Sequence, residues 1–183
     1  MPPLMRRIFW FINKFFMVPV FRFGFGPFFG NPLTGYIMVM RVIGRKTGKV
    51  RFTPVNYAIH KGNIYCLSGG RRESDWFRNL LANPEIELIM PGGCFYTRME
   101  EVIAVDDRLF IARQILKNAG FAGFFEGYNP FTITDEELAG KISDVPILHF
   151  RPLGLGSGAS DAGGWTWIWI LVVTVILIIL LIR

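Results

Sequence analysis

Short runs of β-forming residues, separated by glycine-bounded turns, constrain the fold of this chain more than any other feature. Strands are expected at residues 36–43, 50–59, 64–68, 85–90, 95–105 and 145–151. Tight turns at 44–49 and 91–93 join neighbouring strands into hairpins. Helices are expected at residues 4–17, 76–82 and 106–120, and a capping box predicts a short one after Thr134. Antiparallel hairpins with helices inserted late indicate an α+β fold built on a small barrel.

The end of the chain is strongly apolar. From Trp165 to Ile182, 18 consecutive residues carry no charge, and as a helix they would span about 27 Å, close to the hydrocarbon thickness of a bilayer. Trp165 and Arg183 suit the two membrane interfaces. This pattern predicts a single-pass C-terminal transmembrane anchor at 165–183, although a buried core helix is the alternative. Residues 153–164 are expected to form a Gly/Ser-rich linker. Because no cleavable secretory signal opens the chain, we expect a membrane protein whose globular domain is cytoplasmic.

Residues 1–30 are unusually aromatic. Nine of the 18 phenylalanines lie between Phe9 and Phe29, among cations that include Lys14 and Arg22. Aromatic rings mixed with long basic side chains are typical of a helix that lies on a bilayer surface. The alternative is a helix that packs on its own barrel, and both remain open. The barrel domain itself is expected at 31–152.

The turn after the first strand carries the strongest local signal for a ligand. Five cations crowd into eleven residues without a carboxylate among them: Arg41, Arg45, Lys46, Lys49 and Arg51. Like charges this close repel one another, so an anion is expected beside them. Gly44 and Gly48 allow backbone amides to approach that anion. A phosphate or carboxylate ligand is favoured, while a solvated basic turn and contact with anionic lipid remain alternatives.

Neither of two well-known phosphate-binding motifs is present. The turn has three residues between its glycines where a P-loop has four, and Val50 lacks the hydroxyl that would bind magnesium. The glycines from Gly24 to Gly30 are spaced one residue too widely for a dinucleotide fingerprint and follow no strand.

A second signal follows the third strand. The small residues of Ser68-Gly69-Gly70 leave room for a ring system against the backbone, and two arginines come next. Trp76 and Asn79 lie three residues apart on one face of the following helix. An alternative interpretation makes Trp76 a core residue and Asn79 a tether for a loop.

No side chain stands out as an acid, base, nucleophile or metal ligand. His60 falls in a turn and His149 in a strand, with no motif joining them. Cys66 and Cys94 make neither a disulfide framework nor a metal-binding spacing. We therefore expect no catalytic residue and no metal.

The substrate pocket is expected to be shaped by aromatic side chains. Tyr128 is the candidate substrate-binding residue, with Phe124, Phe125 and Phe131 as neighbouring walls. Ordinary packing in a loop is the alternative.

Two segments together carry a family resemblance. The stretch RKTGKVRFTPV at residues 45–55 resembles the signature GRKTGxxRxxPL of the deazaflavin-dependent nitroreductases, also called the flavin/deazaflavin oxidoreductases. LSGG at 67–70 and DWFRNLLANP at 75–84 resemble that family's ASxGG…PxWYxNLxANP. The resemblance runs from about Phe15 to Pro152. Val50 stands where the family usually has proline, and Gly69 stands where it often has a polar residue.

The resemblance implies a split β-barrel, similar to FMN-binding domains, that binds the anionic coenzyme F420. The resemblance assigns the phosphate and tail to Arg45, Lys46, Thr47, Gly48 and Arg51. Lys49 is added to this cofactor-binding set because of its positive charge. It places Leu67, Ser68 and Gly69 along the deazaflavin ring, with Trp76 supporting that wall.

The resemblance implies hydride transfer from the reduced cofactor to a hydrophobic acceptor, such as a quinone or a nitro compound. Two alternatives are an FMN-dependent reductase of the same fold and a non-catalytic membrane-bound module that binds cofactor or lipid. Membrane lipid is expected as a partner, and a homodimer is left open. The pI of 9.6 by itself suggests nucleic acid, but the aromatic platforms that bases need are not interleaved with the cations, so no nucleic-acid partner is expected.

Overall fold

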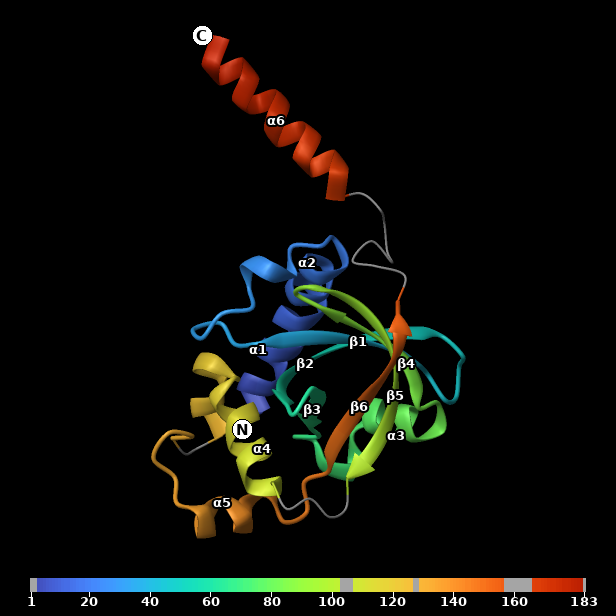
Figure 1. Ribbon diagram of the computed structural model, residues 1–183, viewed down its shortest axis with the longest axis vertical. Coiled ribbons are helices and arrows are strands. Elements are labelled where there is room, and N and C mark those ends of the chain that lie inside the picture. Colours follow the sequence, from blue (N-terminus) through green and yellow to red (C-terminus); the bar gives the residue numbers. More distant parts are fainter. Residues whose placement is uncertain (1–2, 103–106, 127–128, 157–165, 183) are drawn as a thin grey trace.

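Six antiparallel strands form a closed barrel at the centre of the molecule (Figure 1). The computed structural model describes residues 3–102, 107–126, 129–156 and 166–182. The strands are β1 (Ile37–Ile43), β2 (Val50–His60), β3 (Asn63–Leu67), β4 (Glu85–Met90), β5 (Gly93–Val102) and β6 (Ile147–Leu155). Their order around the barrel is β1-β2-β3-β6-β5-β4. The predicted α+β barrel is confirmed, and it is consistent with a split-barrel fold.

The barrel closes because β2 is long enough to pair with two neighbours in succession. Its residues 50–56 pair with β1, and its residues 57–60 pair with β3. The ladders of β6 with β3 and β5, and of β4 with β5 and β1, complete the ring. A register shift between Tyr96 and Thr97 lets β5 bend along β6.

Apolar side chains of every strand and of one helix fill the barrel. Its fully buried members include Met38, Met40, Val42, Cys66, Phe77, Leu80, Leu88, Leu148 and Phe150. Since strand side chains alternate between faces, the other face of β2, β3 and β6 forms a second core under two helices, α4 (Arg108–Lys117) and α5 (Asp135–Ile142). The predicted cap of α5 is present, because the Glu137 N–H donates to Thr134 Oγ1 at 3.2 Å.

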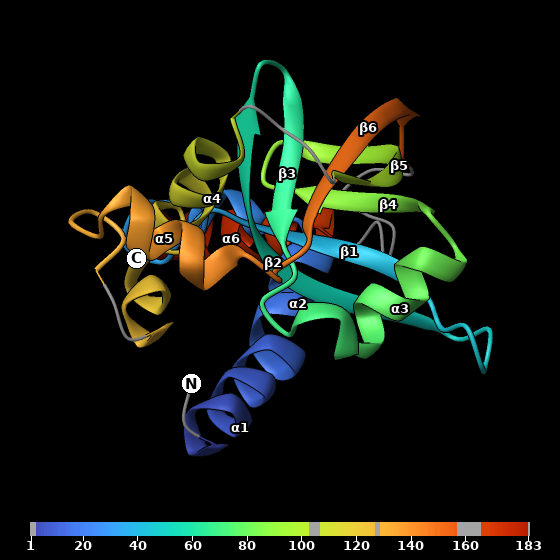
Figure 2. The same cartoon turned by 90° about the horizontal axis from the view of Figure 1, so that it is seen from below.

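Three short helical turns were not expected from the sequence. They are η2 (Gly26–Phe28), η3 (Arg71–Glu73) and η4 (Gly120–Glu126). The helix α3 (Asp75–Ala82) begins one residue before its predicted start and covers one end of the barrel (Figure 2). Its Phe77 and Leu80 insert into the barrel core.

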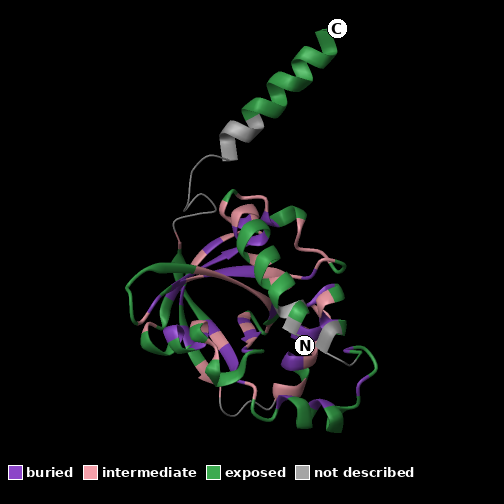
Figure 3. Cartoon of the chain, turned by 180° about the vertical axis from the view of Figure 1, so that it is seen from behind, coloured by how far each residue is buried: buried purple, intermediate pink, exposed green. Residues whose placement is uncertain are grey.

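The N-terminal segment is not one helix but three in succession. They are α1 (Pro3–Ile12), the π-helical η1 (Asn13–Met17) and α2 (Val18–Arg22). From Met17 to Phe21 this segment packs on the outside of the barrel, against Val39 and Ile89. Farther toward the N-terminus the chain is mostly exposed (Figure 3), and its exposed aromatic residues include Phe11. Packing on the barrel thus accounts for the second half of the segment, and a bilayer contact of the first half stays a prediction.

The helix α6 (Thr166–Ile182) is shorter than the predicted membrane anchor. It has 17 residues, one fewer than the uncharged run of 18 from which the anchor was predicted, and a transmembrane helix needs about 20 apolar residues. Across the described residues, no helix has both the length and the apolarity to cross a membrane. The predictions of a transmembrane anchor and of a membrane localisation are therefore wrong. Trp165 and Arg183, on which they also rested, lie outside the described residues.

The predicted linker also begins too early. β6 continues to Leu155, where residue 155 pairs with Phe95 and Gly154 pairs with Tyr96. The pairing partner on β5 therefore extends the strand through glycine, which sequence alone assigned to a flexible segment. The rest of the predicted linker, residues 157–164, lies outside the described residues.

Candidate functional site

The cationic turn between β1 and β2 is a compact, hydrogen-bonded loop. The Gly44 carbonyl accepts from Gly48 N–H at 2.8 Å and from Thr47 N–H at 3.2 Å, and Gly44 N–H donates to the Lys49 carbonyl at 2.9 Å. Gly48 has a φ of +64°, in the left-handed region that favours glycine, and no atom lies within 4 Å of the position that a Cβ would occupy there. The turn is thus fixed from inside and open on its outer side.

Arg45 ties this turn to α3. Its backbone N–H donates to Asn79 Oδ1 at 3.1 Å, and its Nη1 donates to the same oxygen at 2.8 Å. The guanidinium also bonds the Asp75 carbonyl at 3.1 Å and the Asp75 carboxylate at 2.9 Å. Asn79 is only 4% exposed, so its amide is committed to this contact. Asn79 is therefore the loop tether that one interpretation of the sequence expected.

Asp75 is the anchor that sequence reasoning missed. The hydrogen bond and positive charge of Arg45 lower the pKa of its carboxyl, with smaller contributions from Arg78 and Lys46. The sequence marked Asp75 only as a candidate helix cap. No local pattern pairs it with Arg45, because 30 residues separate the two.

The five cations of the turn fall into two groups. Two have protein carboxylates as partners: Arg45 has Asp75, and the Nη1 of Arg41 lies 3.2 Å from Oε2 of the buried Glu87. The other three are exposed and have no carboxylate within ion-pair distance among the described residues: Lys46, Lys49 and Arg51. Carboxylates of the protein thus neutralise part of the positive charge from which a bound anion was predicted, and three cations remain available to a ligand.

The segment after β3 presents open backbone. Ser68 is fully buried, and its N–H donates to the Pro146 carbonyl at 3.0 Å while its Oγ donates to the Arg71 carbonyl at 2.8 Å. Gly69 is exposed, and a Cβ built there would meet no atom within 4 Å. A flat ring can approach the backbone at Gly69, where a larger residue would stand in its way.

The helix α3 brings these two regions into one site. The short helix η3 joins α3 to the Ser68–Gly70 segment, and the first and second turns of α3 hold the cationic turn through Asp75 and Asn79. Trp76 is half-buried and packs against the barrel core, with its ring edge-on to Phe77 at 6.4 Å. One short helix thus connects an anion-attracting loop to a stretch of open backbone. The charges and the open backbone match a flat cofactor that carries an anionic tail.

The predicted aromatic substrate wall is only partly described. Tyr128 lies outside the described residues, as does the side chain of Phe125. The exposed rings of Phe124 and Phe131 stack with centroids 6.3 Å apart, and Lys117 Nζ lies 5.5 Å from the Phe131 centroid. Their role in binding a substrate stays a prediction.

The two histidines are held in separate polar contacts. The Nε2 of His60 lies 2.9 Å from the Asp107 carboxylate, which Lys61 also contacts. The Nε2 of His149 lies 3.0 Å from Asn63 Oδ1. Both cysteines are buried and neither is in a disulfide, and burial raises the pKa of the Cys66 thiol. Among the described residues no group of three or more His, Cys, Asp or Glu side chains has the arrangement of a metal site.

Comparison with known proteins gives the family. The F420H(2)-dependent quinone reductase family matches residues 22–124, more than half of the chain. Similar solved structures include an F420 reductase, at 15% identity over 70% of this chain and 92% of that one with a TM-score of 0.43. An F420-H2-dependent reductase aligns at 17% identity over 63% of this chain and 93% of the other, with a TM-score of 0.42.

A third solved structure comes from Bacteroides thetaiotaomicron and is described as a putative 5-nitroimidazole antibiotic resistance protein. It aligns at 9% identity over 66% of this chain and 74% of that chain, with a TM-score of 0.47. At this similarity the three structures add nothing to the family match. The family match indicates coenzyme F420 as the cofactor. The chain belongs to the F420H(2)-dependent quinone reductase family and is an F420-dependent oxidoreductase.

Proposed function

We propose that this protein transfers hydride from reduced coenzyme F420 to a small hydrophobic acceptor, and that the acceptor is a quinone. The proposal depends on the arrangement of cations and open backbone in the site. Three exposed cations that have no carboxylate partner among the described residues lie on a turn that Arg45 fastens to α3, and η3 joins α3 to the open backbone that follows β3. The family match to quinone reductases supports the choice of acceptor.

Lys46, Lys49 and Arg51 would hold the phosphate and the anionic tail. All three are exposed, so the binding energy comes from several weak charge contacts and depends on ionic strength. Arg51 also lies over the turn, because its Nε is 3.2 Å from the position that a Cβ on Gly44 would take. Thr47 and Gly48 complete the loop beside these cations. One phosphate would not occupy all three, which favours a ligand with a charged tail.

Leu67, Ser68 and Gly69 would bind the ring, with Trp76 behind them. Ser68 N–H and Oγ are both used by protein partners, so the segment is rigid, and the exposed backbone of Gly69 is the part available to a ligand. The bound deazaflavin supplies the hydride, and the protein has to orient it and exclude water. The expectation that no side chain acts as acid or base is consistent with that division of labour.

Cofactor binding is tested first, by quenching of coenzyme F420 fluorescence. The protein should bind coenzyme F420 more tightly than FMN, and a rise in salt should weaken the complex. Replacing Lys46, Lys49 and Arg51 together by alanine should weaken binding by about a hundredfold, since each exposed charge contact contributes up to about 1 kcal/mol. Arg98→Ala, which removes an exposed arginine paired with Glu85, is the matched control and should bind normally.

Turnover is tested separately, with a soluble naphthoquinone and a nitroaromatic compound as acceptors. The protein loaded with reduced coenzyme should restore the absorbance of oxidised coenzyme when the quinone is added, and more slowly with the nitro compound. Tight cofactor binding without any oxidation by the quinone would refute the proposed reaction. Equal affinity for FMN, unaffected by the triple substitution, would refute the proposed binding mode.

A further inference from the structure

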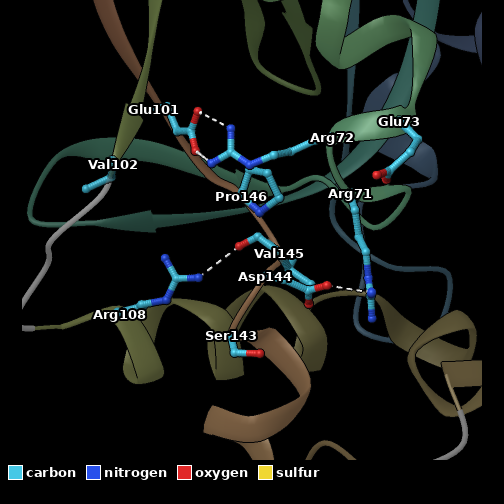
Figure 4. Close-up of a pocket in the computed structure, with 10 residues that line it drawn as sticks. All are labelled: Arg71, Arg72, Glu73, Glu101, Val102, Arg108, Ser143, Asp144, Val145 and Pro146. Carbon is cyan, nitrogen blue, oxygen red and sulfur yellow. Dashed lines mark hydrogen bonds and ion pairs between the residues drawn. The ribbon is translucent and has the colours of Figure 1, made fainter.

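A cavity of about 600 Å³ lies beside Arg71, and its volume is within the range of small-molecule sites. It is separate from the cationic turn, and four segments line it (Figure 4). These are η3, the end of β5, the start of α4 and the connection from α5 to β6, which contribute Arg71, Arg72, Glu73, Glu101, Val102, Arg108, Ser143, Asp144, Val145 and Pro146. Nothing in the sequence brings these segments together.

The backbone of Arg71 is held in an unusual conformation at the edge of this cavity. Its φ is +52°, which is uncommon for a residue with a side chain. Three contacts hold it there: its N–H donates to the Ser68 carbonyl at 2.7 Å, and its carbonyl accepts from Ser68 Oγ at 2.8 Å and from Ser74 Oγ at 3.2 Å. Strained residues that their surroundings hold in place cluster at functional sites. Here the conformation directs a guanidinium to the cavity wall (Figure 4).

The arginines of the cavity retain hydrogen-bond donors. Arg71 uses Nη1 for Asp144, at 2.5 Å, and Arg108 uses Nη2 for the carbonyls of Ile142 and Val145. A guanidinium has five N–H groups, so Nε and Nη2 of Arg71 and Nε and Nη1 of Arg108 have no protein acceptor among the described residues. Arg72 is held by both oxygens of Glu101. Fixed donors of this kind match a ligand whose oxygens accept hydrogen bonds.

The charge of the cavity wall argues against a strongly anionic occupant. Among the described lining residues, three arginines are matched by three carboxylates, those of Glu73, Glu101 and Asp144, so their charges balance. The anionic tail of the cofactor finds a better match at the turn with Lys46 and Lys49. A neutral molecule that carries carbonyl oxygens fits the balanced wall, and Val102, Val145 and Pro146 offer it apolar surface.

The cavity also adjoins the segment assigned to the cofactor ring. Pro146 lines the cavity, and its carbonyl accepts the N–H of Ser68 at 3.0 Å. From these observations we propose that this cavity binds the quinone, and that Arg71 hydrogen-bonds the quinone oxygen that becomes anionic. This inference rests on the proposed function and assigns its acceptor site.

The reaction needs only the reduced cofactor, the quinone and a proton from solvent. The quinone gains the electron pair and the hydrogen of the hydride, so one of its oxygens becomes anionic. That oxygen then takes a proton from solvent, into which oxidation of the cofactor has released one. A guanidinium fixed beside the oxygen stabilises the anion in the transition state more than the neutral quinone, so it acts on the rate as well as on binding.

Arg71→Gly is the decisive variant, because glycine adopts the positive φ without strain and the backbone contacts to Ser68 and Ser74 remain. We expect its dissociation constant for coenzyme F420 to be unchanged and its kcat/KM for a soluble naphthoquinone to fall by about a hundredfold. Titration calorimetry of the cofactor-free protein should show the naphthoquinone bound at least about tenfold more weakly than by the original protein. Arg98→Ala, an arginine taken from another exposed ion pair, should match the original protein in both assays.

The assays distinguish a failure of the proposed function from a failure of the assigned acceptor site. If the original protein does not bind coenzyme F420, or binds it and does not reduce the quinone, the proposed function is at fault. If it reduces the quinone and Arg71→Gly does so equally well, the acceptor site is wrongly assigned. Equal quinone affinity of the two cofactor-free proteins, or no binding by either, overturns the assignment too.

Discussion

Replacing Asn79 by alanine should loosen the cofactor-binding turn while leaving its charges in place. The substitution removes the shared acceptor of two hydrogen bonds, from Arg45 N–H at 3.1 Å and from Arg45 Nη1 at 2.8 Å. The first contributes about 1 kcal/mol and the second, from a charged donor, about 2 kcal/mol. We therefore expect a loss of about 3 kcal/mol in the free energy of unfolding. In a chain of this length that lowers Tm by roughly 6–12 °C.

The same change should weaken cofactor binding. With only Asp75 to hold the guanidinium, the turn has to be ordered by the ligand. We expect the dissociation constant for coenzyme F420 to rise about tenfold, equivalent to about 1.4 kcal/mol. Urea denaturation gives the stability and fluorescence quenching gives the affinity. Asn79→Asp keeps an acceptor oxygen in place and should recover most of both.

An Asn79→Ala protein whose stability lies within about 0.5 kcal/mol of the original, and whose affinity for coenzyme F420 is unchanged, would show that Asn79 does not hold the turn. A large loss of stability with normal affinity would show that the tether holds α3 but does not prepare the turn for the ligand.

Two further predictions concern the same site. Arg45 lowers the pKa of the Asp75 carboxyl from its usual 3.8, so the ion pair of Asp75 with Arg45 stabilises the fold above pH 3.8 and is lost as pH falls through the lower pKa of the folded state. The Tm difference between the original protein and Asp75→Asn should therefore be present at neutral pH and vanish in strong acid. A Tm difference that does not change with pH would contradict this prediction. Gly48→Ala should lower the free energy of unfolding by about 1–2 kcal/mol, because the left-handed φ is strained for alanine although space is open there; a neutral substitution, measured by urea denaturation, would mean that the turn readily changes conformation.

Much of the architecture could be predicted because it is encoded locally. The β4 boundaries at 85–90 agree with the structure, as does the capping of α5 by Thr134. The helix expected at 4–17 failed as a single element because a π-helical stretch and α2 follow α1, with Phe21 buried against the barrel. The predicted last strand was too short, because Gly154 is held in β6 by pairing with the distant strand β5, which the local sequence does not reveal.

The candidate site likewise has parts that the local sequence predicts and contacts that it does not. The cationic turn and the Ser68–Gly70 segment were found as two separate signals, because each is contiguous in the chain. What fastens them together is the contact of Arg45 with Asp75 and Asn79, which are 30 and 34 residues away. The cavity behind Arg71 had no sequence signal at all, because four distant segments form it.

The sequence by itself determined that an antiparallel barrel would carry a dense group of cations on its first hairpin, since residue type and spacing alone produce both. Only the tertiary structure decided which of those cations are available to a ligand. No acidic residue precedes Glu73, so every carboxylate that neutralises the turn has to come from a later segment. Asp75 and Glu87 are brought to Arg45 and Arg41 by the folding of α3 and β4 against β1, and long-range pairing of this kind is set by chain geometry rather than by local composition.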